Sequence, residues 1–360
     1  MLHAMIMAGG GGTRFWPRSR AERPKQFLTF SGHRTLLQAT VDRIAAQVPP
    51  ERTWVITGAA HREEAIRQLP ELPADHIVGE PMGRDTAPCV GLGAAIINKY
   101  DPDATQIVMP ADHVIEPEQE FSRAVHAAEQ VINDFPNALL TFGIPPTFPS
   151  TGYGYIHRGE TVGTRQGVVA SKVKKFVEKP SSETAEKFLV GGDHFWNSGI
   201  FVWKPRAILG ELARQKPGLY AVIDRIAAAW GTPKQDEVFQ GEYANAEKIS
   251  IDFAVMQGAP EVLVVHAPYK WDDVGNWLAL ERHNPQDSDG NTIQALHTGI
   301  DTKNCVIVSD ANHLIATLGV KDLIIVQDGD ATLIADRSHE AAVKHIVDRL
   351  KATKELGKFL

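Results

Sequence analysis

The sequence predicts an α/β protein, in which a mixed, mostly parallel sheet is followed by a small β module and a terminal helix. Three observations lead to this fold class. Up to about residue 145, short apolar runs alternate with segments whose apolar residues have helical spacing. From there to about residue 284 the alternation loosens, and after residue 291 short β runs follow one another between turn residues. At about 150 residues per domain, a length of 360 residues predicts two domains, or one large domain with an appendage. The change of pattern places the expected domains at 1–284 and 285–360.

The first 145 residues are expected to alternate between strands and helices. Short continuous apolar runs predict buried strands, and Pro70 and Pro102 follow two of the helices. Strands joined by a helix run parallel, so this sheet should be covered on both faces. The expected strands are 2–8, 54–58, 77–78, 106–110 and 138–143, and the expected helices are 36–48, 61–69, 89–100 and 121–135.

The middle of the chain predicts a mixed sheet with an inserted lobe, because two-residue alternation and longer loops replace the regular rhythm. The strands expected here are 154–156, 173–177, 200–203 and 261–265, and the helices are 182–189 and 207–212.

The last 76 residues, 285–360, predict a β-helix-like module, although no internal repeat is recognisable. Ser338 is expected to cap the terminal helix. The apolar stripe of that helix would pack on the module or on a second subunit, so a homodimer is plausible. The expected strands are 306–308, 314–317, 323–326 and 332–335, and the stripe consists of Val343, Ile346, Val347 and Leu350.

Composition excludes several classes of function. The net charge is −7, from 37 basic and 44 acidic residues, which argues against a general nucleic-acid coat. No stretch approaches the roughly 20 apolar residues of a membrane span, and no signal peptide is expected. Cys89 and Cys305 are too few for a disulfide framework or a cysteine-based zinc site. We therefore expect a cytoplasmic enzyme that binds neither nucleic acid nor membrane.

A basic segment follows a glycine loop near the N-terminus. Residues 14–25 carry five basic residues and one acidic residue, which indicates a small polyanionic ligand. The preceding Gly9–Gly12 run would let backbone N–H groups approach phosphate oxygens. The loop fits neither a Walker loop, which ends in Gly-Lys-Ser/Thr, nor the glycine spacing of a dinucleotide fingerprint. It is therefore a different phosphate loop or, less favourably, a flexible surface turn.

Eight short motifs follow one another along the chain: Gly9–Pro17, Arg23–Phe27, Glu80–Pro88, Pro110–His113, Gly152–Ile156, Phe176–Pro180, Trp196–Phe201 and Trp271–Trp277. In this order they resemble the motifs of the sugar-nucleotide pyrophosphorylases, and most resemble those of the mannose-1-phosphate guanylyltransferase branch. Phe15 and Arg18 differ from the usual residues of the first motif without changing a charged contact.

The resemblance implies a Rossmann-like fold of the nucleotide-diphospho-sugar transferase type and a reaction of mannose 1-phosphate with GTP, assisted by Mg²⁺. It implies a nucleotide site, in which Glu80 is a candidate for guanine, and a sugar 1-phosphate site. The nucleotide residues would be Gly9, Gly10, Gly12, Thr13, Glu80 and Thr86, and the sugar-phosphate residues would be Gly152, Glu178, Lys179 and Asn197.

The residue chemistry independently suits this reaction. The nucleophile is an ionised phosphate, so the reaction needs no general base, only charge neutralisation and alignment. Arg14 and Lys25 are the candidates for the phosphates. Asp112 follows a strand, at the edge where α/β sheets bind ligands. The family pattern makes Asp273 the second Mg²⁺ ligand, and its neighbour Asp272 should face elsewhere.

Several alternatives remain open. The same chemistry could use another pair, such as glucose 1-phosphate with UTP, or the chain could be a non-catalytic regulatory homologue that binds nucleotide sugars. A glycosyltransferase would use Asp101 and Asp103, although a polar turn is the simpler interpretation of that string and of Asp328–Asp330. Glu178 and Lys179 could form only a surface ion pair. At least two of the remaining basic residues of the segment, Arg18, Arg20 and Arg23, are expected to be solvated or salt-bridged.

Overall fold

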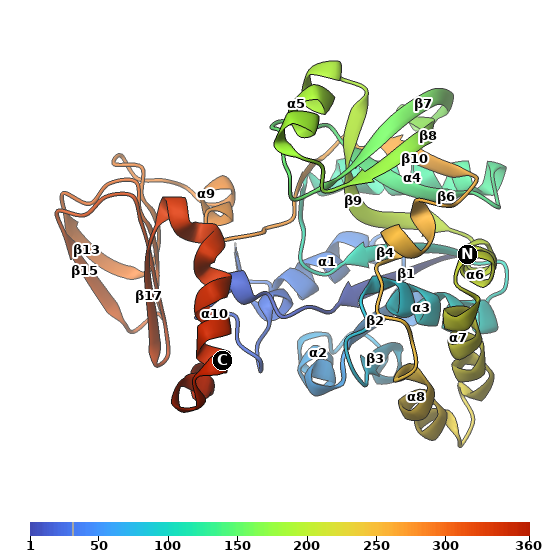
Figure 1. Cartoon of the computed structure of the whole chain (residues 1–360), viewed down its shortest axis with the longest axis horizontal. Helices are drawn as coiled ribbons and strands as arrows, with labels where there is room; N and C mark the ends of the chain where they lie inside the picture. Colours follow the sequence, from blue (N-terminus) through green and yellow to red (C-terminus); the bar gives the residue numbers. More distant parts are fainter. Residues whose placement is uncertain (31) are drawn as a thin grey trace. The chain divides into compact units, whose positions relative to one another are not determined.

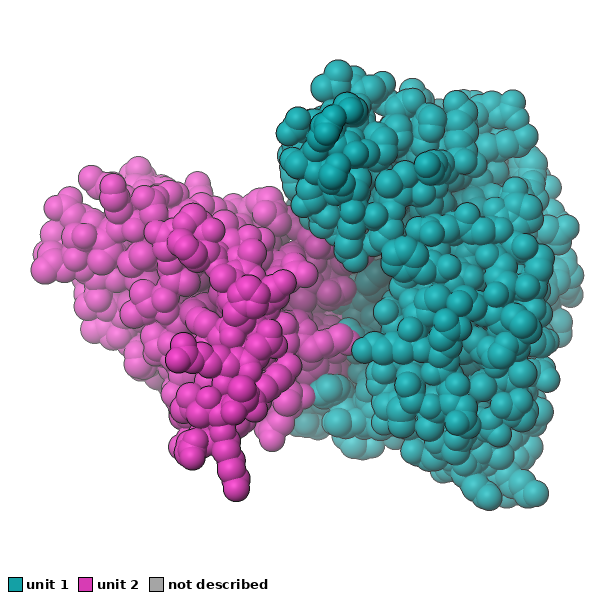
Figure 2. Space-filling view, viewed as in Figure 1, with its two compact units in different colours: residues 1–9, 40–111, 115–271 teal, residues 10–39, 112–114, 272–360 magenta. Residues whose placement is uncertain are grey.

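The computed structural model describes residues 1–30 and 32–360, which form two compact units (Figure 2). Neither unit is continuous along the chain, so compactness divides the molecule differently from a boundary at residue 284, which stays a prediction. Unit 1 comprises 1–9, 40–111 and 115–271, and unit 2 comprises 10–39, 112–114 and 272–360.

A nine-stranded sheet forms the centre of unit 1 (Figure 1), in the order β3-β2-β1-β4-β9-β6-β10-β8-β7. Only β9 and β8 run against the other strands of this sheet, so the predicted mixed, mostly parallel sheet is confirmed. The strands are β1 (Leu2–Ala8), β2 (Thr53–Gly58), β3 (Ile77–Glu80), β4 (Thr105–Pro110), β6 (Leu139–Ile144), β7 (Gly154–Arg165), β8 (Val168–Glu178), β9 (His194–Trp203) and β10 (Val262–His266).

Helices cover this sheet, and the strands β1, β2, β4, β6 and β10 are buried on both faces. Met5 and Ile6 point to opposite faces of β1, and both are fully buried. Met5 packs in an apolar cluster with α3, α6 and α7. The helices are α1 (Leu36–Ala45), α2 (Arg62–Gln68), α3 (Thr86–Tyr100), α4 (Glu118–Asp134), α5 (Ser182–Gly191), α6 (Pro205–Gln215), α7 (Pro217–Ala229) and α8 (Gln235–Tyr243), of which α7 and α8 were not predicted.

Unit 2 contains the C-terminal β module. The strand pair 323–328 and 331–336 is antiparallel, and Thr292 pairs in parallel with Val306, 14 residues later. In the other two pairs the strands are parallel and the partners lie 18 residues apart, since Leu296 pairs with Leu314 and Val306 with Ile324. This recurrence is the turn of a β-helix, and the sequence hid it because the turns share no residue motif. The strands are β12 (Thr292–Gln294), β13 (Leu296–Ile300), β14 (Val306–Val308), β15 (Leu314–Leu318), β16 (Leu323–Asp328) and β17 (Ala331–Asp336); the short strands β5 (Val114–Glu116) and β11 (Lys270–Asp272) form a separate pair.

The terminal helix begins later than predicted. A 3-10 segment, η7 (Arg337–Ala342), precedes α10 (Val343–Ala352), and the Asp336 carboxylate accepts the Ser338 N–H. The prediction that Ser338 is the cap is therefore wrong, because the carboxylate two residues earlier takes that role. Val343, Val347 and Leu350 are buried within unit 2, whereas Ile346 is 40% exposed. A short helix, α9 (Ala279–His283), completes this unit.

One apolar core joins the parts of unit 2. It brings residues of the N-terminal segment 15–36 together with the loop around Trp277, the β module and α10. None of the helices in residues 1–30 and 32–360 has the length and apolar character of a membrane span.

Candidate active site

The glycine loop leads from β1 into a single 3-10 turn, η1 (Thr13–Phe15). Gly12 has a φ of 55°, and a Cβ there would lie 2.4 Å from the Cβ of Lys25. Position 12 therefore requires glycine both for its backbone conformation and for the close approach of Lys25. The Ser19 hydroxyl donates to the Gly11 carbonyl at 2.8 Å, which ties the loop to the segment that follows.

Lys25 brings two of the predicted acidic residues together. It opens the short 3-10 turn η2 (Lys25–Phe27), and its Nζ donates to Asp112 Oδ2 and to the backbone oxygen of Asp273, each at 2.7 Å. These two oxygens cannot be farther apart than the sum of those distances. The Lys25 side chain is only 8% exposed, so its buried charge is compensated by charge-assisted hydrogen bonds.

Arg14 lies at the open side of the same group. It is exposed, and its Nη1 donates to the Gly275 carbonyl at 3.0 Å. A cavity of about 280 Å³ lies here, entirely within unit 2. Six predicted site residues line it, and the structure adds Phe15, His113 and Gly275: the full lining is Gly12, Thr13, Arg14, Phe15, Lys25, Asp112, His113, Asp273 and Gly275.

The backbone around Asp273 is held in an unusual conformation. Val274 has a φ of 46°, a genuine outlier for a β-branched residue, with a cost of about 1–3 kcal/mol. Its side chain is fully buried in the core of unit 2 with Phe15 and Trp277, and this packing offsets the cost of the strained backbone. The conformation fixes the direction in which the chain presents Asp273.

Asp272 has a structural role, as expected from the sequence. Its carboxylate accepts hydrogen bonds from Arg282, from His283 at 3.0 Å and from the Val274 N–H at 2.8 Å. Burial raises the pKa of Asp272, but these partners outweigh it and hold the pKa well below its usual range. Asp272 thus supports the backbone that presents Asp273.

Asp112 and Asp273 have the chemistry that Mg²⁺ requires. Burial raises the pKa of the Asp112 carboxyl, but Lys25 and His113 outweigh it and hold the pKa below its ordinary value. Asp112 is therefore ionised at neutral pH, as a metal ligand must be. Two carboxylates beside a phosphate-sized cavity suit an ion that takes few protein ligands and keeps phosphate and water oxygens. The residues present thus fit Mg²⁺.

All four predicted sugar-phosphate residues lie in unit 1, and two of them, Glu178 and Asn197, lie close together. Asn197 Nδ2 donates to Asp252 Oδ1 at 2.7 Å, and Thr141 Oγ1 donates to Asn197 Oδ1 at 3.1 Å. A Cβ on Gly154 would lie 2.4 Å from Glu178 Oε2 and 3.5 Å from the Cβ of Asn197. Gly154, Glu178, Asn197 and Asp252 therefore form one cluster, which we call the Asn197 cluster.

Asp252 was missed by the sequence analysis. It begins a π-helical turn, η6 (Asp252–Met256), between α8 and β10, where no motif marks it. Burial, together with the charge of Glu178, raises its pKa to about 6. No local sequence pattern could have placed it beside Asn197, because the two are 55 residues apart.

The other two predicted sugar-phosphate residues, Lys179 and Gly152, have few contacts that would tie them to the Asn197 cluster. Lys179 is 63% exposed and lies 3.2 Å from Glu178 Oε1, so the ion pair considered from the sequence does form. Its φ of 45° is uncommon for a residue other than glycine. The Gly152 N–H donates to the Ser150 hydroxyl at 3.2 Å.

Glu80 and Thr86, the predicted nucleotide residues of unit 1, are both engaged. Glu80 is 7% exposed and accepts a hydrogen bond from the Tyr243 hydroxyl. Burial raises its pKa to about 7, against the effect of hydrogen bonds from Tyr243 and Cys89. Thr86 begins α3, and its hydroxyl accepts the Ile251 N–H at 2.8 Å, next to Asp252 in the chain.

The competing Asp-x-Asp string forms a turn. The Asp103 N–H donates to Asp101 Oδ1 at 3.2 Å. Asp101 Oδ2 lies 3.3 Å from His3 Nε2 and 3.6 Å from the N-terminal amine. These contacts are those of a structural turn and disfavour a glycosyltransferase site there.

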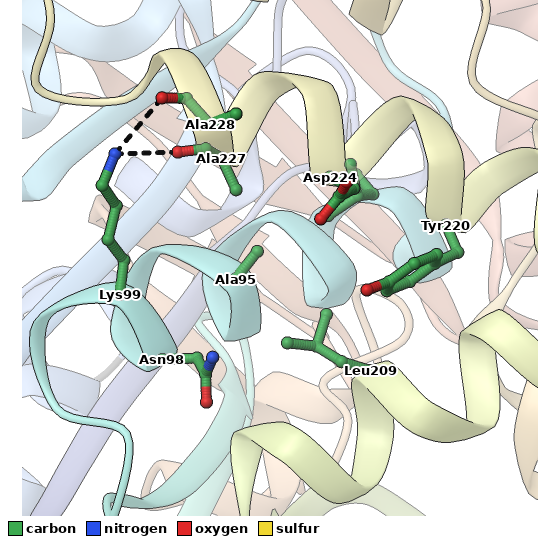
Figure 3. A pocket seen from close by; sticks show the side chains of 9 residues that line it. Ala95, Asn98, Lys99, Leu209, Tyr220, Asp224, Ala227 and Ala228 are labelled. Carbon is green, nitrogen blue, oxygen red and sulfur yellow. Dashed lines mark hydrogen bonds between the residues drawn. The ribbon is translucent and has the colours of Figure 1, made fainter.

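A second cavity, of about 330 Å³, lies between α3, α6 and α7 (Figure 3). It is lined by none of the residues predicted for the site. At its edge, Lys99 Nζ donates to the carbonyls of Ala227 and Ala228, at 3.0 and 3.5 Å, near the end of α7. These bonds satisfy carbonyls at a helix C-terminus, which is a structural role.

One group of three side chains in the described residues also has the spacing of a metal site. It consists of His157, Asp193 and His194. The Asp193 carboxylate lies between the imidazoles, at 3.0 Å from His157 Nε2 and 2.6 Å from His194 Nδ1. Two nitrogen ligands suit a transition metal better than Mg²⁺, so this group does not compete with Asp112 and Asp273 as the Mg²⁺ site.

Known proteins and family models match this chain along nearly its whole length. The family model described as "Nucleotidyl transferase" matches residues 3–290, and that described as "MannoseP isomerase/GMP-like beta-helix domain" matches residues 296–350. Mannose-1-phosphate guanylyltransferase of Escherichia coli (strain K12) is 38% identical over 98% of this chain and 74% of its own length. The enzyme of the same name from Salmonella typhimurium (strain LT2) is also 38% identical, over 98% of this chain and 73% of its own length.

Two solved structures have the same fold. A crystal structure from Thermus thermophilus, described as "mannose-1-phosphate geranyltransferase", superposes with a TM-score of 0.84 at 36% identity. It covers 97% of this chain and 99% of its own. A Helicobacter pylori structure described as mannose-6-phosphate isomerase has a TM-score of 0.59 at 25% identity, over 75% of this chain and 99% of its own.

Proposed function

The chain belongs to the nucleotidyl transferase family, in its mannose-1-phosphate guanylyltransferase branch, and from that premise we propose that it makes GDP-mannose and pyrophosphate from mannose 1-phosphate and GTP. The observation that carries the proposal is the convergence of Arg14, Lys25, Asp112 and Asp273 on one cavity. Two cations and two carboxylates are what a reaction between two polyanions needs.

The chemistry is an in-line displacement at the α-phosphorus of GTP. A phosphate oxygen of mannose 1-phosphate forms the new P–O bond, the bond to the bridging oxygen breaks, and pyrophosphate leaves with its electron pair. Mg²⁺, held by Asp112 and Asp273, would neutralise charge on the phosphate oxygens. The attacking oxygen is already ionised, so no side chain needs to remove a proton.

The cations of the chain align the phosphates. The Arg14 guanidinium is exposed at the cavity and offers a planar fork that can bridge two phosphate oxygens. The Lys25 ammonium is nearly buried and held in place by two acceptors, so it supplies a fixed point charge. Backbone N–H groups of Gly9, Gly10, Gly12 and Thr13 would contact the remaining oxygens.

The sugar 1-phosphate would bind at the Asn197 cluster. Glu178 and Asn197 offer an acceptor and an amide to sugar hydroxyls, and Gly152 would let the backbone approach the ring. The Lys179 side chain is exposed, so its ammonium group can turn from Glu178 toward the sugar phosphate. Asp252 holds the Asn197 amide by accepting from its Nδ2, and thereby orients it.

Guanine would be read by Glu80, with Thr86 close to the nucleoside. A carboxylate can accept from the two adjacent donors of guanine, which adenine does not offer. Glu80 already accepts from Tyr243, so binding would have to exchange or share that bond. Glu80→Gln should therefore weaken the preference for GTP over ATP, and an unchanged preference would remove Glu80 from this role.

We also propose a homodimer and a cytoplasmic location. Leu296, Ile300, Leu314 and Leu318 are each more than half exposed, and the β13–β15 register sets them side by side on one sheet face. Such a face supports association with a second copy. Sedimentation velocity of the Leu314→Ser/Leu318→Ser double variant should show a smaller species than the parent if this face is the interface.

Pyrophosphorolysis tests the function directly. The purified chain, with Mg²⁺ and pyrophosphate, would be offered GDP-mannose, GDP-glucose, UDP-glucose and ADP-glucose in turn. GDP-mannose should react fastest. Faster release of UTP from UDP-glucose would instead support the glucose 1-phosphate alternative, and no turnover of any of the four would support a non-catalytic binding protein.

A further inference from the structure

The middle of the basic segment is bound to the β module within unit 2. Arg20 Nη2 donates to Asp330 Oδ1 at 2.7 Å and to the Asp328 carbonyl at 2.9 Å. Arg23 forms an ion pair with Asp328 Oδ2, and Arg18 Nε lies 4.0 Å from the same oxygen. Three arginines that stand between Arg14 and Lys25 in the chain are thus held by one turn, Asp328–Asp330.

Asp328 is the centre of this contact. Its side chain is only 10% exposed, whereas that of Asp330 is 59% exposed. Burial raises the pKa of Asp328 above its ordinary value, although the charges of Arg23 and Arg18 act against it. Removal of this largely buried carboxylate should have a larger effect than removal of an exposed one, because the largely buried Arg18 and the half-exposed Arg23 both lose their counter-charge.

The segment that Asp328 holds is closed on itself and leads directly into Lys25. Arg20 and Arg23 exchange both backbone hydrogen bonds, each at 3.1 Å. Lys25 follows two residues later, and its Cβ lies where a side chain at Gly12 would be. A displacement of this closed loop would therefore move the ammonium of Lys25 relative to the glycine loop.

The β module and the terminal helix also reach the other end of the basic segment. Trp16 Nε1 donates to the Phe359 carbonyl at 2.8 Å, and Phe15 and Trp16 share their apolar core with Val326 and Leu333 of the β module. The turn η7 packs on η1, which carries Arg14. Both ends of the segment that carries the phosphate-binding cations are thus supported by residues 292–360.

We propose that Asp328 is a positioning residue for the phosphate site. Its carboxylate holds Arg23 and faces Arg18, and its backbone carbonyl holds Arg20. These contacts set the loop that places Lys25, and so make the C-terminal β module part of the construction of the site. The identity of the substrate in this inference rests on the proposed function. The positioning of Lys25 by Asp328 would affect any pyrophosphate group bound beside Lys25.

The test compares Asp328→Asn with Asp330→Asn in the full-length chain. Both variants remove one carboxylate charge from the same turn, but only the first removes the buried one. The primary measurement is the dissociation constant of pyrophosphate, by calorimetry in the presence of Mg²⁺. Pyrophosphate carries neither base nor sugar, so it reports on the phosphate site whichever nucleotide sugar the enzyme makes.

We expect Asp328→Asn to weaken pyrophosphate binding at least fivefold and Asp330→Asn to change it less than twofold. In steady-state assays, Asp328→Asn should raise KM for GTP by a similar factor and leave KM for mannose 1-phosphate within twofold. Arg23→Gln should act in the same direction, and the double variant should be no worse than the more affected single variant, since both remove one contact.

Pyrophosphate binding within twofold of the parent in Asp328→Asn would overturn the proposal. So would a rise in both KM values that follows a loss of thermal stability, because that pattern indicates general unfolding. A parent chain that binds pyrophosphate but forms no GDP-mannose would contradict the proposed function alone, and the binding comparison would still decide the role of Asp328.

Discussion

The cavity around Lys25 in unit 2 and the predicted sugar and base residues of unit 1 both include acidic side chains, yet the pKa values of these carboxyls are shifted in opposite directions. Asp112 lies beside an ammonium group, and its pKa is held below the ordinary value. Asp252 and Glu80 are hydrogen-bonded to neutral partners, Asn197 and Tyr243, and burial raises their pKa values to about 6 and about 7.

This difference follows from what each region would bind. A phosphate site needs charges that stay the same throughout the neutral pH range, and pairing of a cation with a carboxylate provides them. A site for hydroxyls or a base needs acceptors and donors more than net charge. A carboxyl that titrates near neutrality can fill either role, because its protonation can change with the group that binds.

The largest expected effect is at Asp112 and Asp273, the two carboxylates proposed to bind Mg²⁺. Asp273→Asn should lower kcat by about 100- to 1,000-fold, because it removes one negative oxygen from the ion that neutralises the reacting phosphates. The Mg²⁺ concentration for half-maximal rate should rise as well. The exposed Asp236→Asn in α8 serves as a control and should stay within twofold of the parent. A folded Asp273→Asn enzyme with the parental rate would show that this carboxylate is not a metal ligand.

A smaller loss is expected from crowding of the glycine loop. An added Cβ at Gly12 would meet Lys25 at 2.4 Å, so Gly12→Ala must shift either the loop or Lys25. A shift of this kind should lower kcat/KM for GTP about 100-fold, since alignment of the reacting groups supplies much of the rate. In the matched control Gly210→Ala, the new Cβ meets nothing within 4 Å, and activity should be kept. Equal activity of the two variants would contradict the close approach.

Loss of the exposed cation should have a moderate effect. Arg14→Gln removes an exposed guanidinium whose hydrogen bond goes to the Gly275 carbonyl, so folding should be little affected. We expect KM for GTP to rise about 10- to 30-fold, which corresponds to one charge-assisted hydrogen bond, and KM for mannose 1-phosphate to change little. Arg225→Gln, which breaks an exposed pair with Glu242, is the control. Similar changes in both KM values would argue against a triphosphate contact.

The smallest expected effect is on the free energy of unfolding and comes from Glu80, the residue proposed to bind guanine. The pKa of Glu80 rises from 4.5 to about 7 on folding, so the folded protein holds this proton more tightly than the unfolded chain. The contribution of Glu80 to the free energy of unfolding should therefore fall by about 3 kcal/mol at most as pH rises from about 4.5 to about 7. Above that pH it should stay constant.

Urea unfolding at several pH values checks this contribution. The glutamine of Glu80→Gln does not titrate. The free energy of unfolding of the parent should therefore fall relative to that of the variant as pH rises from about 4.5 to about 7. A constant difference would mean that Glu80 ionises normally in the folded protein.

The sequence predicted the phosphate side more completely than the sugar side. Gly12, Thr13, Arg14, Lys25, Asp112 and Asp273 lie in short motifs and do line one cavity. Asp252 could not be predicted, because its role depends on a contact with Asn197 across the fold. The contact of Arg23 with Asp328 spans 305 residues and is equally invisible to local pattern.

The fold shows the same division. Apolar periodicity predicted most strands of the sheet, because each is a continuous buried run. It would also have found α7, whose Leu219, Val222, Ile223 and Ile226 have helical spacing and are buried. The strands β12 and β13 were not predicted, because β12 has only three residues and the two apolar residues of β13, Leu296 and Ile300, are separated by His-Thr-Gly.

The central claim, that the cavity around Lys25 is where GDP-mannose is made, is tested most directly by comparing two carboxylate variants in one assay. GDP-mannose formation from GTP and mannose 1-phosphate would be measured for Asp112→Asn and for Asp103→Ala at saturating Mg²⁺. We predict that Asp112→Asn loses at least 100-fold in kcat and that Asp103→Ala keeps the parental rate. Full activity of Asp112→Asn together with an inactive Asp103→Ala would contradict the claim and place the chemistry at the Asp101–Asp103 turn.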